Sequence, residues 1–134
     1  MILVDTSAWV EFDRATGSAV HRRLAELIEG EADVAVTEPV VMEVLAGARD
    51  DARALDLQRL MDRNRLLRVD PVVDFAAAAR IYRTCRRSGV TPRDLLDCVI
   101  ASVALRQGAA LLTADSDLVR VADVMGITLD PASA

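Results

Sequence analysis

Short apolar runs alternate along the chain with longer segments in which apolar side chains recur every three or four residues. Short runs that end in polar side chains are typical of buried strands in a parallel sheet, and the longer segments have the periodicity of helices. We predict strands at residues 2–4, 34–36, 66–69, 109–112 and 127–129, with helices between them. This order predicts an α/β fold, with a small open, mainly parallel sheet of four to five strands flanked by helices. Residues 1–134 contain no repeat, linker or low-complexity segment, so we expect a single domain.

The segment at residues 94–108 is apolar on every side, which predicts a helix buried in the core. Its first turn nevertheless carries Asp94 and Asp97. Thr91, Pro92 and Asp94 fit a capping box, with Thr91 as the N-cap, which gives Asp94 a structural role. Asp97 has no such role, and buried carboxylates are costly unless they are paired or bound to a metal. We therefore take Asp97 as the first candidate for chemistry.

Other carboxylates are expected to gather near Asp97. Asp5 follows the first predicted strand, Asp115 and Asp117 follow the fourth, and Glu43 lies early in a predicted helix. In open parallel sheets, ligands bind beyond the carboxyl ends of the strands, which all meet at one edge. Each of these carboxylates alone is explained as a helix cap, but together they predict a site for a hard cation such as Mg²⁺ or Mn²⁺.

A cleft of this kind suits the hydrolysis of a phosphodiester, because a metal ion activates water and stabilises the leaving oxygen. The chain does not contain the residues that several other classes of enzyme require. The single histidine, His21, falls on the polar side of its helix, so no Ser-His-Asp or Cys-His set is expected. No glycine-rich phosphate loop is present. Cys85 and Cys98 have no metal-binding spacing and are expected to be buried free thiols.

Composition and charge indicate the class of protein and a possible partner. The 134 residues are 52% hydrophobic and 28% charged, with a net charge of −5, which is typical of a compact cytoplasmic protein. No apolar run is long enough to span a membrane, and the N-terminus does not resemble a signal peptide. All 16 basic residues are arginine, and Arg86, Arg87 and Arg93 precede the central helix. They form either a solvated helix face or a rim that binds the phosphates of RNA.

Four short motifs occur in order along nearly the whole chain. They are MILVDTSA at 1–8, PVVMEVLAG at 39–47, LDCVIAS at 96–102 and LLTADSDL at 111–118. In this order and spacing they resemble the PIN-domain ribonucleases, and specifically the VapC toxins of type II toxin–antitoxin systems. Each motif alone is weak evidence, whereas the four together are specific.

The resemblance implies roles for the acidic residues. Asp5 and Asp97 correspond to direct ligands of Mg²⁺, for which Mn²⁺ can substitute, and Asp115 completes the acidic set. Glu43 corresponds to a ligand or to a group that positions water. Asp117 matches a less constant second aspartate of the family.

Several departures and additions concern residues near this set. The family usually has Phe after its second aspartate, whereas this chain has Leu118. Thr6 or Ser7 is expected to assist through a hydroxyl group. Asp94 is retained as a possible site residue beside its capping role.

The resemblance also implies partners. PIN-domain toxins of this type cleave single-stranded segments of structured RNA, such as tRNA or rRNA. They form homodimers, and hetero-oligomers with a cognate antitoxin whose C-terminal segment covers the cleft. We expect an apolar groove around Trp9, Phe12 and Val44 to receive that antitoxin.

Two other classes with an acidic pocket are disfavoured. A haloacid-dehalogenase-like phosphatase requires a second aspartate two residues after the first, where this chain has Ser7. That phosphatase and a response-regulator receiver domain both require a lysine, and the chain has none. A PIN-domain nuclease of RNA maturation and an inactive PIN-like binding module remain as alternatives to the toxin.

Overall fold

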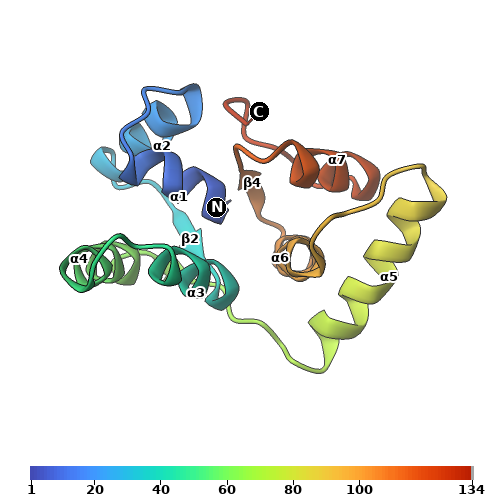
Figure 1. Ribbon diagram of the computed structural model, residues 1–134. Coiled ribbons are helices and arrows are strands. Elements are labelled where there is room, and N and C mark those ends of the chain that lie inside the picture. The colour runs from blue at the N-terminus through green and yellow to red at the C-terminus, as the bar shows by residue number, and fades with distance from the viewer. Residues whose placement is uncertain (134) are drawn as a thin grey trace.

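The computed structural model describes residues 1–133, in which a parallel sheet lies between two groups of helices (Figure 1). The four strands are β1 (Ile2–Val4), β2 (Val34–Val36), β3 (Arg65–Leu66) and β4 (Ala110–Leu112). They lie in the order β3-β2-β1-β4, and each pairing of neighbours is parallel. This confirms the predicted α/β fold with a small open parallel sheet. The last predicted strand, at 127–129, is reduced to a single bridge between Leu129 and Leu111.

The helices form two packed groups, one on each side of the strands in Figure 1. The first group contains α1 (Thr6–Asp13), α2 (Ala19–Glu29), α3 (Glu38–Ala46) and α4 (Asp51–Asp62). The second contains α5 (Val73–Arg87), α6 (Leu95–Gln107) and α7 (Ser116–Met125). No helix within residues 1–133 has the length and apolar character needed to cross a membrane.

Helix α6 is the buried helix that the apolar segment predicts. All residues from 98 to 104 are buried, and Gly108 ends the helix in a left-handed conformation with φ of 65°. Cys85 and Cys98 are free and buried, as expected. Burial raises the pKa of the Cys98 thiol to about 12, so this thiol stays protonated and unreactive at neutral pH.

The predicted start of this helix is wrong. The N-cap is Asp94, whose side chain accepts a hydrogen bond from the backbone N–H of Leu96 at 2.9 Å, and no capping box forms at Thr91. The reason is a tertiary contact: the carboxylate of Asp117 accepts the backbone N–H of Arg93 at 2.9 Å. This bond holds the segment before α6 against the start of α7, and the helix begins only after it.

The expected apolar groove around Trp9, Phe12 and Val44 is also absent from the surface. Trp9 and Val44 are buried, and Phe12 packs edge-on against Trp9 at a centroid distance of 6.2 Å. These side chains fill the core between the sheet and the first group of helices. The prediction was wrong because apolar side chains at helical spacing do not reveal which face of a helix is covered.

A buried ion pair joins α5 to α6. The Asp74 side chain is fully buried, and it accepts hydrogen bonds from Ser102 Oγ at 2.7 Å and from Arg106 Nη2 at 2.7 Å. Burial alone would raise the pKa of Asp74, but the hydrogen bonds from Arg106 and Ser102 outweigh it and lower the pKa. Arg106 also donates to the backbone carbonyl of Arg68, so the pair anchors the segment that leads from β3 into α5.

Replacing Asp74 with Asn should destabilise the fold by roughly 2–4 kcal/mol, because it leaves Arg106 without its buried partner. Urea denaturation of the two proteins measures this difference. The matched control is Asp33→Asn, which breaks a pair with Arg65 in which both side chains are about half exposed. That change should cost less than about 1 kcal/mol. Equal effects of the two substitutions would contradict the role assigned to Asp74.

Candidate active site

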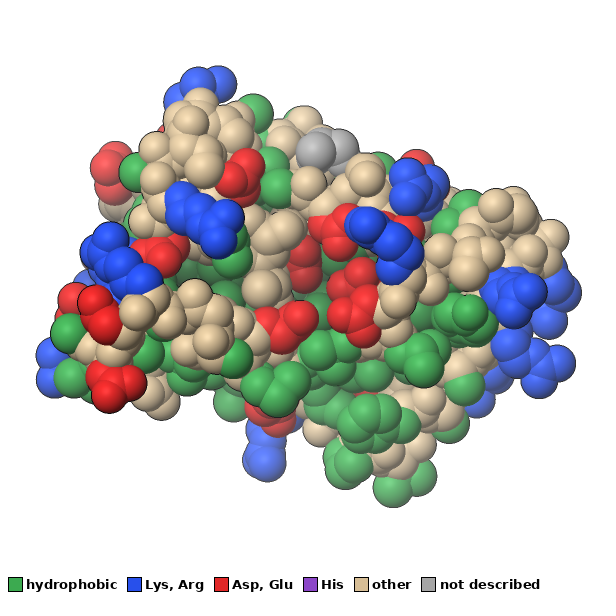
Figure 2. Space-filling model, viewed as in Figure 1, with side chains coloured by type: hydrophobic (Ala, Val, Ile, Leu, Met, Phe, Trp, Pro, Cys, Tyr) green, Lys and Arg blue, Asp and Glu red, His purple; other side chains and the backbone are tan. Residues whose placement is uncertain are grey.

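A cleft of about 360 Å³ opens beyond the carboxyl ends of β1 and β4. The chain runs from β1 through β2 to β3 on one side of the sheet and then crosses to β4 on the other side of β1. The cleft therefore lies at the point where the strand order reverses, which is where open parallel sheets bind ligands. The residues that line it are Asp5, Thr6, Ser7, Glu43, Arg93, Asp94, Asp97, Asp115 and Asp117. All carboxylates singled out in the sequence thus come together (Figure 2).

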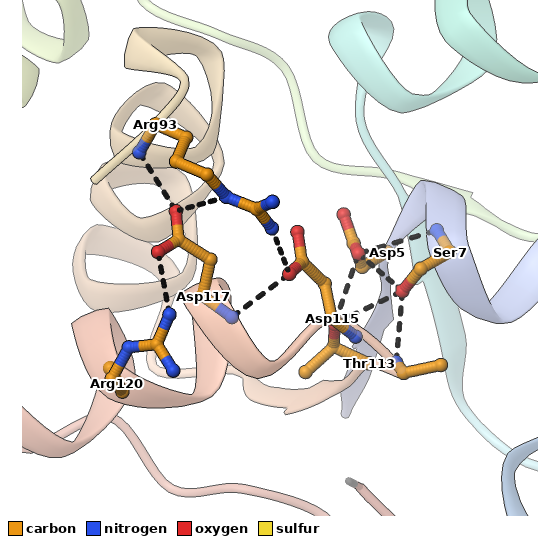
Figure 3. Close-up of polar contacts among 8 residues, drawn as sticks. Asp5, Ser7, Arg93, Thr113, Asp115, Asp117 and Arg120 are labelled. Carbon is orange, nitrogen blue, oxygen red and sulfur yellow. Dashed lines mark hydrogen bonds and ion pairs between the residues drawn. The ribbon is translucent and has the colours of Figure 1, made fainter.

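Strand register fixes the position of Asp5. Val4 pairs with Leu112, so Asp5 and Thr113 leave the sheet side by side. Asp5 Oδ2 accepts hydrogen bonds from Thr113 Oγ1 at 3.0 Å, from Ser7 Oγ at 2.7 Å and from the Ser7 backbone N–H at 3.3 Å. In Figure 3 the other carboxylate oxygen of Asp5 points away from these partners. One oxygen is therefore held by the protein, and the second remains for a ligand.

Asp5 also forms the N-cap of α1. Burial raises the pKa of this carboxyl, and the hydrogen bonds from Ser7 and Thr113 oppose that rise. The sequence analysis did not identify Thr113 as a site residue. Thr113 directly follows β4, just as Asp5 directly follows the neighbouring strand β1. A Ser or Thr at that position is the signal that could have identified it.

The pKa of the Asp97 carboxyl group is strongly raised. Burial and the negative charges of neighbouring carboxylates, first that of Asp5 and then that of Asp115, raise its pKa to about 8. No hydrogen bond from the described residues reaches its side chain. Because its charged form has no donor, Asp97 at neutral pH needs either a proton or a cation.

Glu43 approaches the cleft from α3, where Thr6 holds it. The hydroxyl of Thr6 donates a hydrogen bond of 2.8 Å to Glu43 Oε1. Burial raises the pKa of Glu43, the bond from Thr6 opposes the rise, and the charge of Asp5 adds to it. Thr6 thus positions Glu43, and Ser7 positions Asp5, so the two hydroxyl groups act on different carboxylates.

Asp115 and Asp117 differ in how far they are committed to structural contacts (Figure 3). Asp115 is the N-cap of α7 and accepts the backbone N–H of Asp117 at 2.9 Å through Oδ1. The buried Asp117 uses both carboxylate oxygens, since Oδ2 accepts the Arg93 backbone N–H and Oδ1 accepts Arg120 at 3.0 Å. Asp115 therefore keeps an oxygen for the cleft, whereas Asp117 mainly stabilises its wall.

Three helices begin at this cleft. Asp5, Asp94 and Asp115 are the N-caps of α1, α6 and α7. The N-terminus of a helix carries partial positive charge and favours nearby anions, which offsets part of the repulsion among the carboxylates. A capping role and a place in the site are thus compatible in one residue.

The predicted arginine rim is divided by the structure. Arg93 lines the cleft and pairs with Asp115 at 3.5 Å. Arg86 and Arg87 are exposed in the last turn of α5 and do not line the cleft. Only Arg93 is therefore placed to contact a substrate group inside it.

The chemistry of the cleft suits a hard divalent cation. Its potential ligands are carboxylate and hydroxyl oxygens, without His or Cys. Within residues 1–133, no three Asp, Glu, His or Cys side chains are arranged to hold one ion as they stand. The fit therefore rests on donor type and charge, above all on the raised pKa of Asp97, which a cation would lower.

Comparison with known proteins agrees with this fold. The family model of the PIN domain matches residues 2–124. Ribonuclease VapC11 of Mycobacterium tuberculosis is 45% identical over 128 residues, which are 95% of this chain and 96% of that protein. The chain therefore belongs to the PIN-domain family. Within that family, its sequence groups it with the VapC ribonucleases.

Solved structures share the fold at lower sequence identity. VapBC2 from Rickettsia felis, bound to a DNA fragment from its promoter, has a chain that superposes with a TM-score of 0.74 at 16% identity. That match covers 97% of this chain and 98% of the other. The VapC20 toxin of Mycobacterium tuberculosis, which cleaves the sarcin–ricin loop, superposes with a TM-score of 0.66 at 22% identity, over 89% of this chain and 93% of that one.

Replacing Asp97 with Asn should stabilise the cation-free protein, and increasingly so as pH rises. The unfolded carboxyl ionises near pH 4, whereas the folded one stays protonated up to about pH 8. The folded state therefore binds more protons in this window, and its stability falls as pH rises through it. We expect little difference at about pH 5 and a gain of about 1–3 kcal/mol at about pH 9.

Urea denaturation in EDTA at the two pH values measures this effect. Asp56→Asn is the matched control, because it replaces an exposed carboxylate on α4, which does not line the cleft, and it should change little at either pH. If the Asp97→Asn protein were less stable than the wild type at high pH, the ionised carboxylate of Asp97 would not be the unfavourable group inferred from its raised pKa.

Proposed function

We propose that this chain is the toxin of a toxin–antitoxin pair and cleaves RNA as a Mg²⁺-dependent endoribonuclease, with Mn²⁺ as a substitute. The observation that carries the proposal is a cleft with several converging carboxylates, in which the Asp97 carboxyl group receives no hydrogen bond from the described residues and has a raised pKa. The substrate that we expect is a specific site in structured RNA such as tRNA or rRNA. The sarcin–ricin loop cleaved by the structurally similar VapC20 is one such RNA.

The carboxylates have distinct proposed roles. Asp5, Asp97 and Asp115 would hold the cation, each through a carboxylate oxygen that accepts no hydrogen bond from the described residues. Glu43, held by Thr6, either completes the ligand set or orients the attacking water. A bound divalent cation would activate that water and stabilise the leaving oxygen. Ser7 and Thr113 keep Asp5 in place throughout, since they bind the oxygen that faces away from the ligand.

Substrate contacts outside the cleft are assigned to arginines. Arg86 and Arg87 lie together at the exposed end of α5, where they would bind RNA backbone phosphates. This contact adds affinity but no sequence information. The acidic net charge of the chain makes such local basic positions more important for binding RNA.

The proposed inhibitor is a cognate antitoxin that covers the cleft. In the similar structure from Rickettsia felis, VapC is assembled with VapB on promoter DNA. An antitoxin side chain with positive charge would be attracted to the acidic cleft and would compete there with the metal ion. Since Trp9 and Val44 are buried, the antitoxin must dock on other apolar side chains than those first expected.

A second copy of the chain is the occupant that we propose for the exposed apolar face beside the cleft. A nearly wholly apolar groove of about 300 Å³ lies between α5 and α6 and is lined by Phe75, Ala78, Ala79, Leu95, Leu96 and Val99. Phe75 is 57% exposed and Leu95 59% exposed. Figure 2 shows hydrophobic side chains gathered below the acidic cluster. Exposed apolar patches of this kind mark protein interfaces, and a two-fold dimer buries the same patch on both subunits.

Purified chain should cut cellular RNA into discrete fragments with Mg²⁺ or Mn²⁺ and not in EDTA. Asp97→Asn and Asp5→Ala should each reduce the rate by more than about a hundredfold, because loss of even a supporting residue at a metal site costs 10–100-fold. The control is Asp56→Asn, which changes an exposed carboxylate on α4. Gel analysis and end mapping of the fragments give the rate and the site.

The same assay separates the alternatives. Absence of cleavage with either metal by a folded protein would favour an inactive binding module. Trimming of precursor RNA ends, rather than internal cleavage of mature tRNA or rRNA, would favour a nuclease of RNA maturation.

Phe75→Glu and Leu95→Glu should each convert the proposed homodimer to a monomer, because each places a charge in the apolar groove. Light scattering after size-exclusion chromatography measures the molar mass. Leu55→Glu is the control, since Leu55 is similarly exposed at 48% but lies on α4. Dimers of unchanged stability in both groove variants would show that the interface lies elsewhere.

A further inference from the structure

Arg93 is the single cationic side chain among the described residues that line the cleft. The same lining holds six carboxylates, those of Asp5, Glu43, Asp94, Asp97, Asp115 and Asp117. Arg93 belongs to the segment that enters α6 and reaches across toward the start of α7 (Figure 3). Its contacts therefore decide how much of the negative charge is neutralised before a cation binds.

The backbone of Arg93 is fixed while its side chain is free to move. The backbone N–H donates to the buried Asp117 at 2.9 Å, and Asp117 is held from its other oxygen by Arg120. The Arg93 side chain is 74% exposed, and its ion pairs are long, with 3.5 Å to Asp115 and 4.0 Å to Asp117. Ion pairs that are long and exposed are weak, so the guanidinium can leave Asp115 without disturbing the loop.

We propose that Arg93 is an internal counter-ion of the cleft, which competes with the divalent cation for Asp115 and, when displaced, binds a phosphate of the RNA. The proposal rests on the proposed metal-dependent cleavage of RNA. A guanidinium 3.5 Å from Asp115 and a divalent cation on that carboxylate repel each other, so binding of one weakens binding of the other. The protein thereby limits carboxylate repulsion while no cation is bound.

The second half of the proposal follows from the charge of the substrate. A phosphodiester that approaches six carboxylates is repelled unless cations lie at the entrance. Arg93 is at that entrance, is largely exposed, and carries the planar donor set that matches phosphate oxygens. Release of Arg93 from Asp115 thus makes a phosphate-binding group available when the cleft has gained its cation.

The test compares Arg93→Gln with Arg120→Gln. Both variants remove one positive charge next to Asp117, but only Arg93 also pairs with Asp115. Isothermal titration with Mn²⁺ alone should show about three- to tenfold tighter binding by Arg93→Gln than by the wild type, and a much smaller change for Arg120→Gln. Thermal melting checks that both variants fold.

Cleavage of RNA at saturating Mn²⁺ then tests the phosphate contact. Arg93→Gln should raise KM and lower kcat, together reducing kcat/KM about tenfold or more, and Arg93→Lys should restore part of this loss because it keeps the charge. The combination of tighter cation binding with slower cleavage is the signature of the proposed residue. Loss of a merely structural contact would not tighten cation binding.

Specific results would overturn the inference. Equal Mn²⁺ affinities of the two glutamine variants, or no Mn²⁺ binding by the wild type, would overturn the competition for Asp115. Wild-type kcat/KM in Arg93→Gln would overturn the phosphate contact. The Mn²⁺ titration needs no RNA, so it tests the competition for Asp115 independently of RNA cleavage. A wild-type chain that binds Mn²⁺ but cleaves no RNA would therefore count against the proposed function, and the titration would still test the competition.

Discussion

Parallel pairing of β1 with β4 is the constraint on which the rest of the site depends. The ladder continues one residue past β1, since the Asp5 backbone N–H donates to Leu112 at 2.9 Å. Both strands end at the same edge, and α1 and α7 begin directly after them, so their N-cap carboxylates lie next to each other. A shift of one residue in this register would turn Asp5 toward the opposite face of the sheet and would separate it from Thr113.

The carboxylates in the cleft are tolerated to different degrees. Asp5, Asp115 and Asp117 each accept hydrogen bonds from backbone or side-chain donors, and the starts of three helices add favourable partial charge. No hydrogen bond from the described residues reaches the Asp97 side chain, and the pKa of its carboxyl group is raised to about 8. The protein thus keeps one carboxyl group whose charged form is unfavourable until a cation arrives. This is a local cost in stability of the kind that is common at functional sites.

The sequence alone did not predict which of the three arginines before α6 would line the cleft. Arg86, Arg87 and Arg93 are close in sequence, yet only Arg93 lines the cleft, because the loop between α5 and α6 is pulled against Asp117. The same contact moved the start of α6 from the expected capping box to Asp94. A single long-range hydrogen bond therefore prevented the capping box that the local sequence predicts. The same bond placed Arg93, the single arginine among the described residues that line the cleft.

The sequence by itself determined the α/β architecture, the buried helix around residues 98–104 and the gathering of Asp5, Glu43, Asp97 and Asp115 at one edge. It could do so because hydrophobic periodicity and the common direction of parallel strands are properties of the chain itself. Tertiary structure alone decided that Trp9 is buried, that Thr113 supports Asp5 and that Arg93 faces Asp115. These features depend on contacts between side chains from distant segments of the chain, and local sequence patterns do not predict such contacts.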